Sequence, residues 1–158
     1  MARVDGFGLL IGAVDEGRVL VTGAAGFIGS HVVRELLAAG REVRATVREP
    51  KNAEFLKVLP GSERLEIVAM DLLDRASVGA ALAGCTDVIH CAAALFVGAV
   101  DKQRDVVDPS VAGTQNLLDA IDAAGGVNRL IHTSSVAAVR RTAYRNGDIF
   151  SSADWCDD

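Results

Sequence analysis

Aromatic residues are scarce in this chain of 158 residues, which contains five phenylalanines, one tyrosine and one tryptophan. Half of the residues are hydrophobic, so alanine, valine and leucine have to fill the core, which suits closely packed layers of strands and helices. Clusters of lysine and arginine are also missing, because the net charge is −5 and the basic residues are scattered. The composition therefore argues against a nucleic-acid-binding surface, and the length suits a single domain.

Cysteine pairs and membrane-spanning runs are missing too. Cys85, Cys91 and Cys156 are an odd number without CxxC spacing, which favours small buried hydrophobic residues over a disulfide framework or a metal site. The apolar run 7–14 is too short to span a bilayer and lacks a convincing signal-peptide cleavage site. We therefore expect a cytoplasmic protein without a membrane partner, in which residues 1–17 form a leader outside the core.

The most informative stretch is VLVTGAAGFIGS, residues 19–30. An apolar run at 18–21 predicts a buried strand, which ends in three glycines spaced by three. In a strand, turn and helix of this type, Gly23 permits the tight turn, Gly26 lets the backbone approach a diphosphate, and Gly29 lets helix and strand pack closely.

A helical pattern follows these glycines. Its apolar side contains Phe27, Ile28, Val32, Val33, Leu36 and Leu37. The positive end of this helix, with Phe27 and Ile28 in its first turn, faces the diphosphate. A strand before the glycines and a helix after them favour a dinucleotide-binding site over a purely structural glycine turn.

Strand-like and helical stretches alternate along the rest of the chain. We expect strands at 18–22, 42–47, 65–70, 87–91 and 129–133, and helices at 27–39, 51–59, 75–82 and 109–124. This alternation predicts an α/β Rossmann-type doubly wound parallel sheet of order 3-2-1-4-5, with helices on both faces. Residues 18–139 are then the dinucleotide-binding domain, and 140–158 the incomplete start of a substrate-side region.

Several motifs resemble the extended short-chain dehydrogenase/reductase superfamily, which includes the NAD-dependent epimerase/dehydratase family. They are TGAAGFIG at 22–29, VRATVREP at 43–50, MDL at 70–72, HCAA at 90–93 and HTSS at 132–135. The resemblance covers residues 18–157 and is strongest to the branch of dihydroflavonol reductase, cinnamoyl-CoA reductase and 3β-hydroxysteroid dehydrogenase-like enzymes. It implies an oxidoreductase that binds a nicotinamide dinucleotide.

The end of the second strand points to NADP(H) rather than NAD(H). An NAD site usually carries an acidic residue there, but this chain has Val47 followed by Arg48. A guanidinium suits the 2′-phosphate, which a carboxylate would repel. Arg48 matches the arginine that holds this phosphate in the resembled branch, and Arg44, earlier in the strand, is a second candidate. The alternative for both arginines is a solvated strand end.

Other cofactor residues follow from the resemblance. Asp71 is expected to accept a hydrogen bond from the adenine amino group, and the Leu72 backbone to contact the adenine. The alternative for Asp71 is a helix N-cap, but Asp74 could supply that cap instead. The small residues Cys91, Ala92 and Ala93 let the ribose and the diphosphate approach the backbone after the fourth strand.

The end of the fifth strand carries the residues assigned to chemistry. The resemblance makes Ser135 the catalytic serine that bonds the substrate oxygen, with Thr133 and Ser134 lining the nicotinamide, whereas strand-end capping is the structural alternative for the serines. The Tyr-x-x-x-Lys pair of the resembled enzymes is missing: Tyr144 is followed four residues later by Asp148. The chain is therefore either a fragment of a longer enzyme or a natural short form. We expect His132 to point into the sheet packing.

These observations favour the NADP(H)-binding portion of a reductase or dehydrogenase that transfers hydride to or from a small carbonyl or alcohol substrate. A nucleotide-sugar epimerase or dehydratase and a non-catalytic dinucleotide sensor are the alternatives. We expect neither a metal nor a nucleic-acid partner. A five-stranded half of an enzyme should leave apolar surface exposed, with dimerisation or poor solubility as the result.

Overall fold

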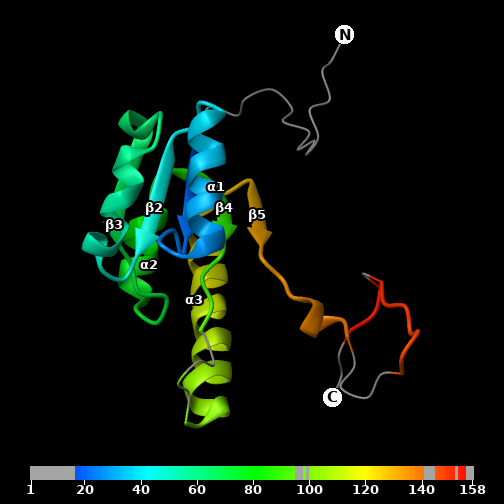
Figure 1. The fold of residues 1–158 in the computed structure, drawn as a ribbon. Coiled ribbons are helices and arrows are strands. Elements are labelled where there is room, and N and C mark those ends of the chain that lie inside the picture. Colours follow the sequence, from blue (N-terminus) through cyan, green and yellow to red (C-terminus); the bar gives the residue numbers. More distant parts are fainter. Residues whose placement is uncertain (1–16, 95–97, 99, 141–144, 152, 156–158) are drawn as a thin grey trace.

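Five parallel strands form one sheet in the computed structural model, which describes residues 17–94, 98, 100–140, 145–151 and 153–155. The strands are β1 (Arg18–Thr22), β2 (Val43–Val47), β3 (Leu65–Ala69), β4 (Cys85–His90) and β5 (Arg129–His132). Their order is β3-β2-β1-β4-β5, as predicted (Figure 1). The order reverses between β1 and β4, so the carboxyl ends of these two strands flank the switch point where ligands bind in such sheets.

Helical segments cover both faces of the sheet. The longer ones are the helices α1 (Phe27–Ala38), α2 (Arg75–Leu82) and α3 (Asp108–Ala124) and the 3-10 helix η1 (Pro50–Val58). Three shorter segments are η2 (Ser62–Arg64), the π-helical η3 (Gln103–Val107) and η4 (Val136–Ala138). The crossovers through α1 and η1 run toward one edge and those through α2 and α3 toward the other, which places the two pairs on opposite faces.

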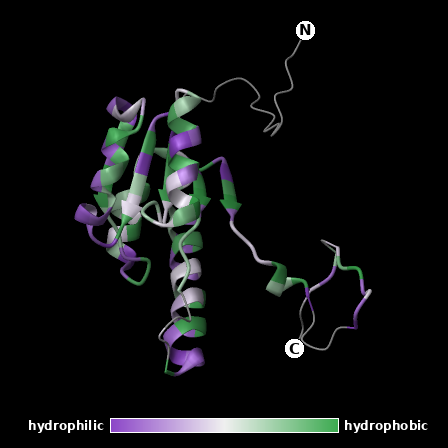
Figure 2. Cartoon of the chain, in the orientation of Figure 1, coloured by the Kyte–Doolittle hydropathy of each residue, from purple (hydrophilic) through white to green (hydrophobic). Residues whose placement is uncertain are grey.

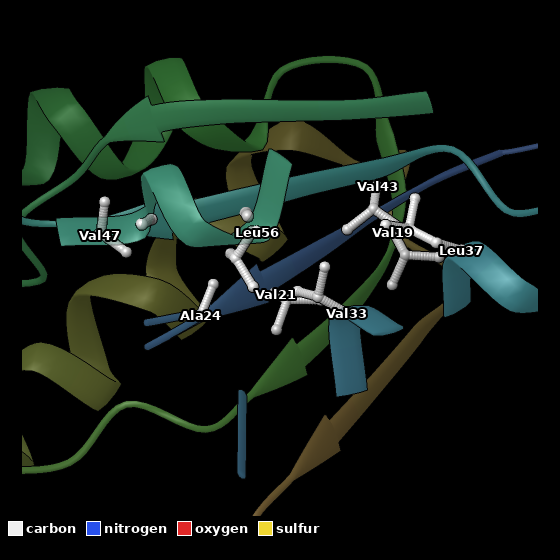
Figure 3. Packing of buried hydrophobic residues seen from close by; sticks show 10 residues of the cluster. Val19, Val21, Ala24, Val33, Leu37, Val43, Val47 and Leu56 are labelled. Atoms are coloured by element: carbon white, nitrogen blue, oxygen red, sulfur yellow. The ribbon is translucent and has the colours of Figure 1, made fainter. Parts of the chain in front are cut away.

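The alternation of side chains along β1 explains the two cores. Val19 and Val21 pack with Val33 of α1 and Leu56 of η1 on one face (Figure 3). Leu20 points the other way and packs with the core formed by α2, α3 and β4. Hydrophobic and hydrophilic residues both occur around α1 (Figure 2), as expected for a helix with one side on the sheet and one in solvent.

Some local predictions were wrong. Phe27 and Ile28 were expected on the apolar side of α1, but their exposed fractions are 81% and 52%, because the first turn lies at the sheet edge and not over it. The helical stretch predicted at 51–59 is present as a 3-10 helix that spans Pro50–Val58. β4 begins at Cys85, two residues earlier than expected, because Cys85 pairs with Arg18 of β1.

A buried ion pair links the segment before β2 to β4 near the amino ends of the strands, opposite the switch point. Arg41 Nη2 lies 2.9 Å from Asp87 Oδ2 and donates a second bond of 3.2 Å to the Gly17 carbonyl. Both side chains are at least nine-tenths buried. Removal of one partner of such a pair leaves an uncompensated buried charge, so this pair is a structural anchor far from the switch point.

Within the described segments, no helix is both long and apolar enough to cross a membrane.

Candidate functional site

The turn after β1 and the first turn of α1 each contain one position whose geometry favours glycine. Gly23 has a φ of +66°, in the left-handed region where glycine is favoured. A Cβ on Gly29 would lie 2.3 Å from the Gly23 carbonyl oxygen and 2.8 Å from its carbon. A side chain at position 29 would therefore separate α1 from the turn, which agrees with the predicted close packing of helix and strand.

The first turn of α1 offers amide groups at the switch point. Gly26 is the N-cap of the helix, it has no side chain to cap the amides, and the first helical bond runs from the Ser30 N–H to its carbonyl at 2.9 Å. Helix geometry leaves the N–H groups of Phe27 and Ile28 without acceptors inside the helix. These groups and the positive end of the helix dipole favour an anion there.

The Thr22 hydroxyl joins β1 to the segment after β4. Its Oγ1 accepts hydrogen bonds of 3.1 Å from the N–H groups of Cys91 and Ala92 and lies 2.6 Å from His90 Nδ1. A hydroxyl has two lone pairs and one proton. Because the two N–H donors occupy both lone pairs, the hydroxyl proton goes to His90 Nδ1, and the imidazole carries its own proton on Nε2.

His90 is held neutral by its surroundings. It is 2% exposed, and burial lowers the pKa of His90 to about 4, with a smaller contribution from the nearby His132. The ring centroids of the two histidines are 5.0 Å apart. His132 itself is exposed, so the expectation that it points into the sheet packing was wrong.

The segment after β4 lies against both the glycine turn and β5. A Cβ on Gly23 would lie 2.9 Å from Ala92 Cα, so these two backbones touch. Thr133 donates its N–H to the His90 carbonyl at 3.0 Å, and its hydroxyl lies 3.5 Å from Cys91 Sγ. Thr133, Cys91 and Ala92 are thus brought together with the glycine turn, and Ala93 is exposed next to them.

Arg44 does not lie at this edge, so its assignment to a phosphate was wrong. The guanidinium donates bonds of 2.7 Å to the carbonyls of Ala81 and Ala83 at the end of α2, and a bond of 2.9 Å to Glu66. Cys85 Sγ is also close, at 3.8 Å, and burial raises the pKa of the Cys85 thiol. Arg44 is 9% exposed and acts as a buried cap for the carbonyls of α2.

Arg48 lies one residue beyond β2 and is exposed. In the described part of the chain it has no ion pair, whereas the neighbouring Glu49 pairs with Lys51 at 2.7 Å. The Arg48 guanidinium is therefore available to a ligand at the carboxyl end of β2.

Asp71 and Leu72 form the loop after β3. The Leu73 N–H donates to Asp71 Oδ1 at 2.9 Å, while Asp74 caps α2 by accepting from the Ala76 N–H at 3.0 Å. The capping alternative thus applies to Asp74 and not to Asp71. Asp71 is exposed, and its backbone N–H donates to Ser77 Oγ at 3.0 Å.

The predicted catalytic serine is not assembled with the glycine turn. Ser135 Oγ accepts a hydrogen bond of 3.2 Å from the Ala137 N–H and caps η4, and η4 stands away from the sheet (Figure 1). Ser134 is exposed. Tyr144 lies outside the described residues. Ser135 still has a hydroxyl proton to donate, because its bond to Ala137 uses only a lone pair.

Thr22 and His90 were missed as site-forming residues. Each is the last residue of its strand, and the two strands flank the switch point. Their contact was predictable from the sequence, because both strand ends carry a polar residue at adjacent positions in the sheet. Among the described residues, no group of three or more histidine, cysteine or acidic side chains is placed to hold a metal.

Comparisons with known proteins agree with the motifs. A model of the NAD dependent epimerase/dehydratase family matches residues 19–148. Dihydroflavonol 4-reductase of Hordeum vulgare is 42% identical over 151 residues, covering 90% of this chain and 42% of the relative. Cinnamoyl-CoA reductase 1 of Oryza sativa subsp. japonica is 43% identical over 143 residues, covering 88% and 40%. The chain thus spans less than half the length of these curated relatives.

A solved structure of a reductase has a similar fold. Yeast methylglyoxal/isovaleraldehyde reductase Gre2, complexed with NADPH, matches with a TM-score of 0.80 at 28% identity, and the match covers 89% of this chain and 44% of that one. The doubly wound sheet is therefore shared with an enzyme whose crystal structure contains a nicotinamide dinucleotide.

Proposed function

The chain belongs to the NAD dependent epimerase/dehydratase family, and we propose that it is the NADP(H)-binding portion of a reductase or dehydrogenase acting on a small carbonyl or secondary alcohol. The named relatives are reductases. Because the chain spans less than half of their length, the activity is proposed for the whole protein. We also propose a cytoplasmic location.

The close contact of Gly29 with Gly23 carries the proposal. The 2.3 Å separation of a Cβ at position 29 from the Gly23 carbonyl means that α1 starts directly against the end of β1. This contact directs the first-turn amides of α1 into the switch point, where a diphosphate would accept from Phe27 and Ile28. Gly26 leaves room for its approach.

Arg48 supports NADP(H) over NAD(H). The position after β2 is basic and exposed, and the one acidic neighbour, Glu49, is paired with Lys51. A guanidinium forms charge-assisted bonds with a phosphate that are worth about 1.5–3 kcal/mol each. The same basic residue disfavours a nucleotide-sugar epimerase that uses NAD, for which an acid is expected at the end of the second strand.

The residues around the nicotinamide end have distinct tasks. When bound, the nicotinamide supplies or accepts a hydride. In the proposed enzyme, Thr133 and Ser134 line that end of the crevice, and Ser135 donates a hydrogen bond to the substrate oxygen without giving up its proton. A proton donor for the product alkoxide is still needed. The family resemblance assigns that step to a Tyr-x-x-x-Lys pair, which these 158 residues do not contain.

Titration calorimetry with NADPH and NADH tests the cofactor. We expect NADPH to bind more tightly, and Arg48→Met to reduce the preference at least tenfold, because about 1.4 kcal/mol corresponds to a factor of ten. Tighter binding of NADH would overturn the role of Arg48, and no binding of either would overturn the function. Cofactor binding by the whole protein without turnover on a panel of carbonyl compounds would favour a dinucleotide sensor.

Exposed apolar side chains support self-association. Val111 and Leu118 lie on α3 with exposed fractions of 64% and 38%, and Ile131 of β5 has 43%. Apolar surface of this kind is commonly covered by another protein surface. We propose a homodimer, which light scattering tests; a monomer at all concentrations would contradict it.

A further inference from the structure

Helix α3 holds the loop that carries Asp71 and Leu72. Asn116 Nδ2 donates a hydrogen bond of 2.8 Å to the Leu72 carbonyl. One turn earlier, a Cβ added to Gly113 would lie 3.0 Å from Leu72 Cβ. The loop after β3 therefore rests on α3 through one polar contact and one close contact at Gly113, where an added Cβ would push Leu72 away by a few tenths of an ångström.

The orientation of the Asn116 amide is fixed by its second partner. Arg75 Nε donates to Asn116 Oδ1 at 2.8 Å, so the amide oxygen faces the guanidinium and the amide nitrogen faces the Leu72 carbonyl. Arg75 also forms an ion pair with Asp119, one turn further along α3. Asn116 is thus aligned as a donor toward the loop, because the reversed amide would place its nitrogen against the Arg75 donor.

The Asp71 carboxylate is fixed at one oxygen. Its Oδ1 accepts from the Leu73 N–H at 2.9 Å, and the Asp71 carbonyl accepts from the Asp74 N–H at 3.0 Å and from Ser77 Oγ at 2.9 Å. Oδ2 remains as an acceptor on an exposed residue. A displacement of Leu72 would move this carboxylate, because the two residues are adjacent in a short turn.

We propose that Asn116 and Gly113 are positioning residues for recognition of the adenine amino group by Asp71. This inference rests on the proposed binding of NADP(H) and adds a specific role for α3, which has no predicted contact with the cofactor at these positions. Asn116 fixes the Leu72 carbonyl, Gly113 fixes how closely Leu72 approaches α3, and together they set where Asp71 Oδ2 lies.

Calorimetry with NADPH and with its hypoxanthine analogue, in which an oxo group replaces the 6-amino group, tests the proposal. The wild-type chain is expected to prefer NADPH. Asn116→Asp retains the acceptor for Arg75 but loses the donor to Leu72, so we expect NADPH binding about five- to tenfold weaker and a preference for the amino group that falls toward one. Gln115→Ala is the matched control and should leave both quantities unchanged. The Gln115 amide donates to Asp119 at 2.7 Å and, among the described residues, forms no hydrogen bond with the loop after β3.

Gly113→Ala keeps the test informative if Asn116→Asp unfolds the chain. Alanine favours a helix interior over glycine, so we expect an undiminished melting temperature together with a reduced preference for NADPH over the analogue. A wild-type chain that binds both equally well, or variants that keep the full preference, would overturn the positioning role and leave the proposed function intact. Absence of NADPH binding by the wild type would overturn both.

Discussion

Thr22 Oγ1 lies 2.6 Å from His90 Nδ1, at the ends of the two strands that flank the switch point. Since the same hydroxyl accepts from two N–H groups of the following segment, one threonine determines the tautomer of the histidine and the path of Cys91 and Ala92. The Thr22 side chain therefore extends the pairing of β1 and β4 beyond the ends of the strands, to the segment that follows β4.

Replacement of this hydroxyl should destabilise the chain. Thr22→Val keeps the shape but leaves two N–H groups and His90 Nδ1 without a partner, and each buried unsatisfied group costs about 1–3 kcal/mol. With three groups affected, we expect the free energy of unfolding to fall by at least about 3 kcal/mol in urea denaturation. Thr22→Ser keeps the hydroxyl and is the control, with a loss of about 1 kcal/mol from the missing methyl group. Equal losses in both variants would contradict the three-bond arrangement.

The buried histidine predicts a loss of stability in mild acid. The pKa of His90 is lowered to about 4, whereas an unperturbed histidine has a pKa of about 6.5. As pH falls from about 6.5 to 4, the unfolded chain takes up a proton that the folded chain refuses, so stability falls by up to about 3 kcal/mol.

His90→Asn is the matched variant for that measurement. Asparagine offers an acceptor oxygen at the place of Nδ1 but does not titrate. Urea denaturation at about pH 7 and about pH 5 should show a smaller loss for the variant than for the wild type. Parallel losses would assign the acid sensitivity to the carboxylates instead.

Two arginines four residues apart should respond in opposite ways. Arg44→Met removes the donor to the Ala81 and Ala83 carbonyls, and we expect about 1.5–3 kcal/mol less stability with an unchanged ratio of NADPH to NADH affinity. Arg48→Met should leave the stability within about 0.5 kcal/mol of wild type. Urea denaturation measures the stability of both variants, and calorimetry measures their ratio of NADPH to NADH affinity. A changed affinity ratio in Arg44→Met would support the assignment of Arg44 to the 2′-phosphate after all.

Substitutions at Gly29 of α1 and at Gly26, the N-cap of that helix, should separate an effect on folding from an effect on binding. In Gly29→Ala the new Cβ meets the Gly23 carbonyl, so we expect about 3 kcal/mol of destabilisation. In Gly26→Ala the nearest atom is 3.2 Å from the new Cβ, so the chain should fold and lose NADPH affinity. Thermal melts followed by calorimetry distinguish the two results. Full binding by Gly26→Ala would show that a diphosphate does not approach there.

Much of the fold was predictable from local patterns. The boundaries of α2, Arg75–Leu82, were predicted correctly, because a capping aspartate precedes the helix and Gly84 follows it. The strand order followed from the chirality of crossovers. The nature of η1 was not predictable, because periodicity over so short a stretch does not separate a 3-10 helix from an α-helix.

The site was harder to predict where contacts join distant parts of the chain. Arg44 lies in β2 and Arg48 directly follows that strand, and both carry the same charge. Only the α2 carbonyls beside Arg44 make it a buried cap, whereas Arg48 stays exposed. The donor from Asn116 to Leu72 spans 44 residues and has no local pattern. The glycine turn was predictable because its chemistry resides in consecutive residues.

The close contact of α1 with the glycine turn affects how fast a ligand binds. Because Gly29 and Gly23 are in contact before any ligand arrives, the amides of the first turn are ordered by folding itself. A diphosphate that binds there needs no loop closure and freezes little additional backbone. Association should then be governed by diffusion and charge steering rather than by a slow conformational step, with a single kinetic phase under stopped-flow mixing.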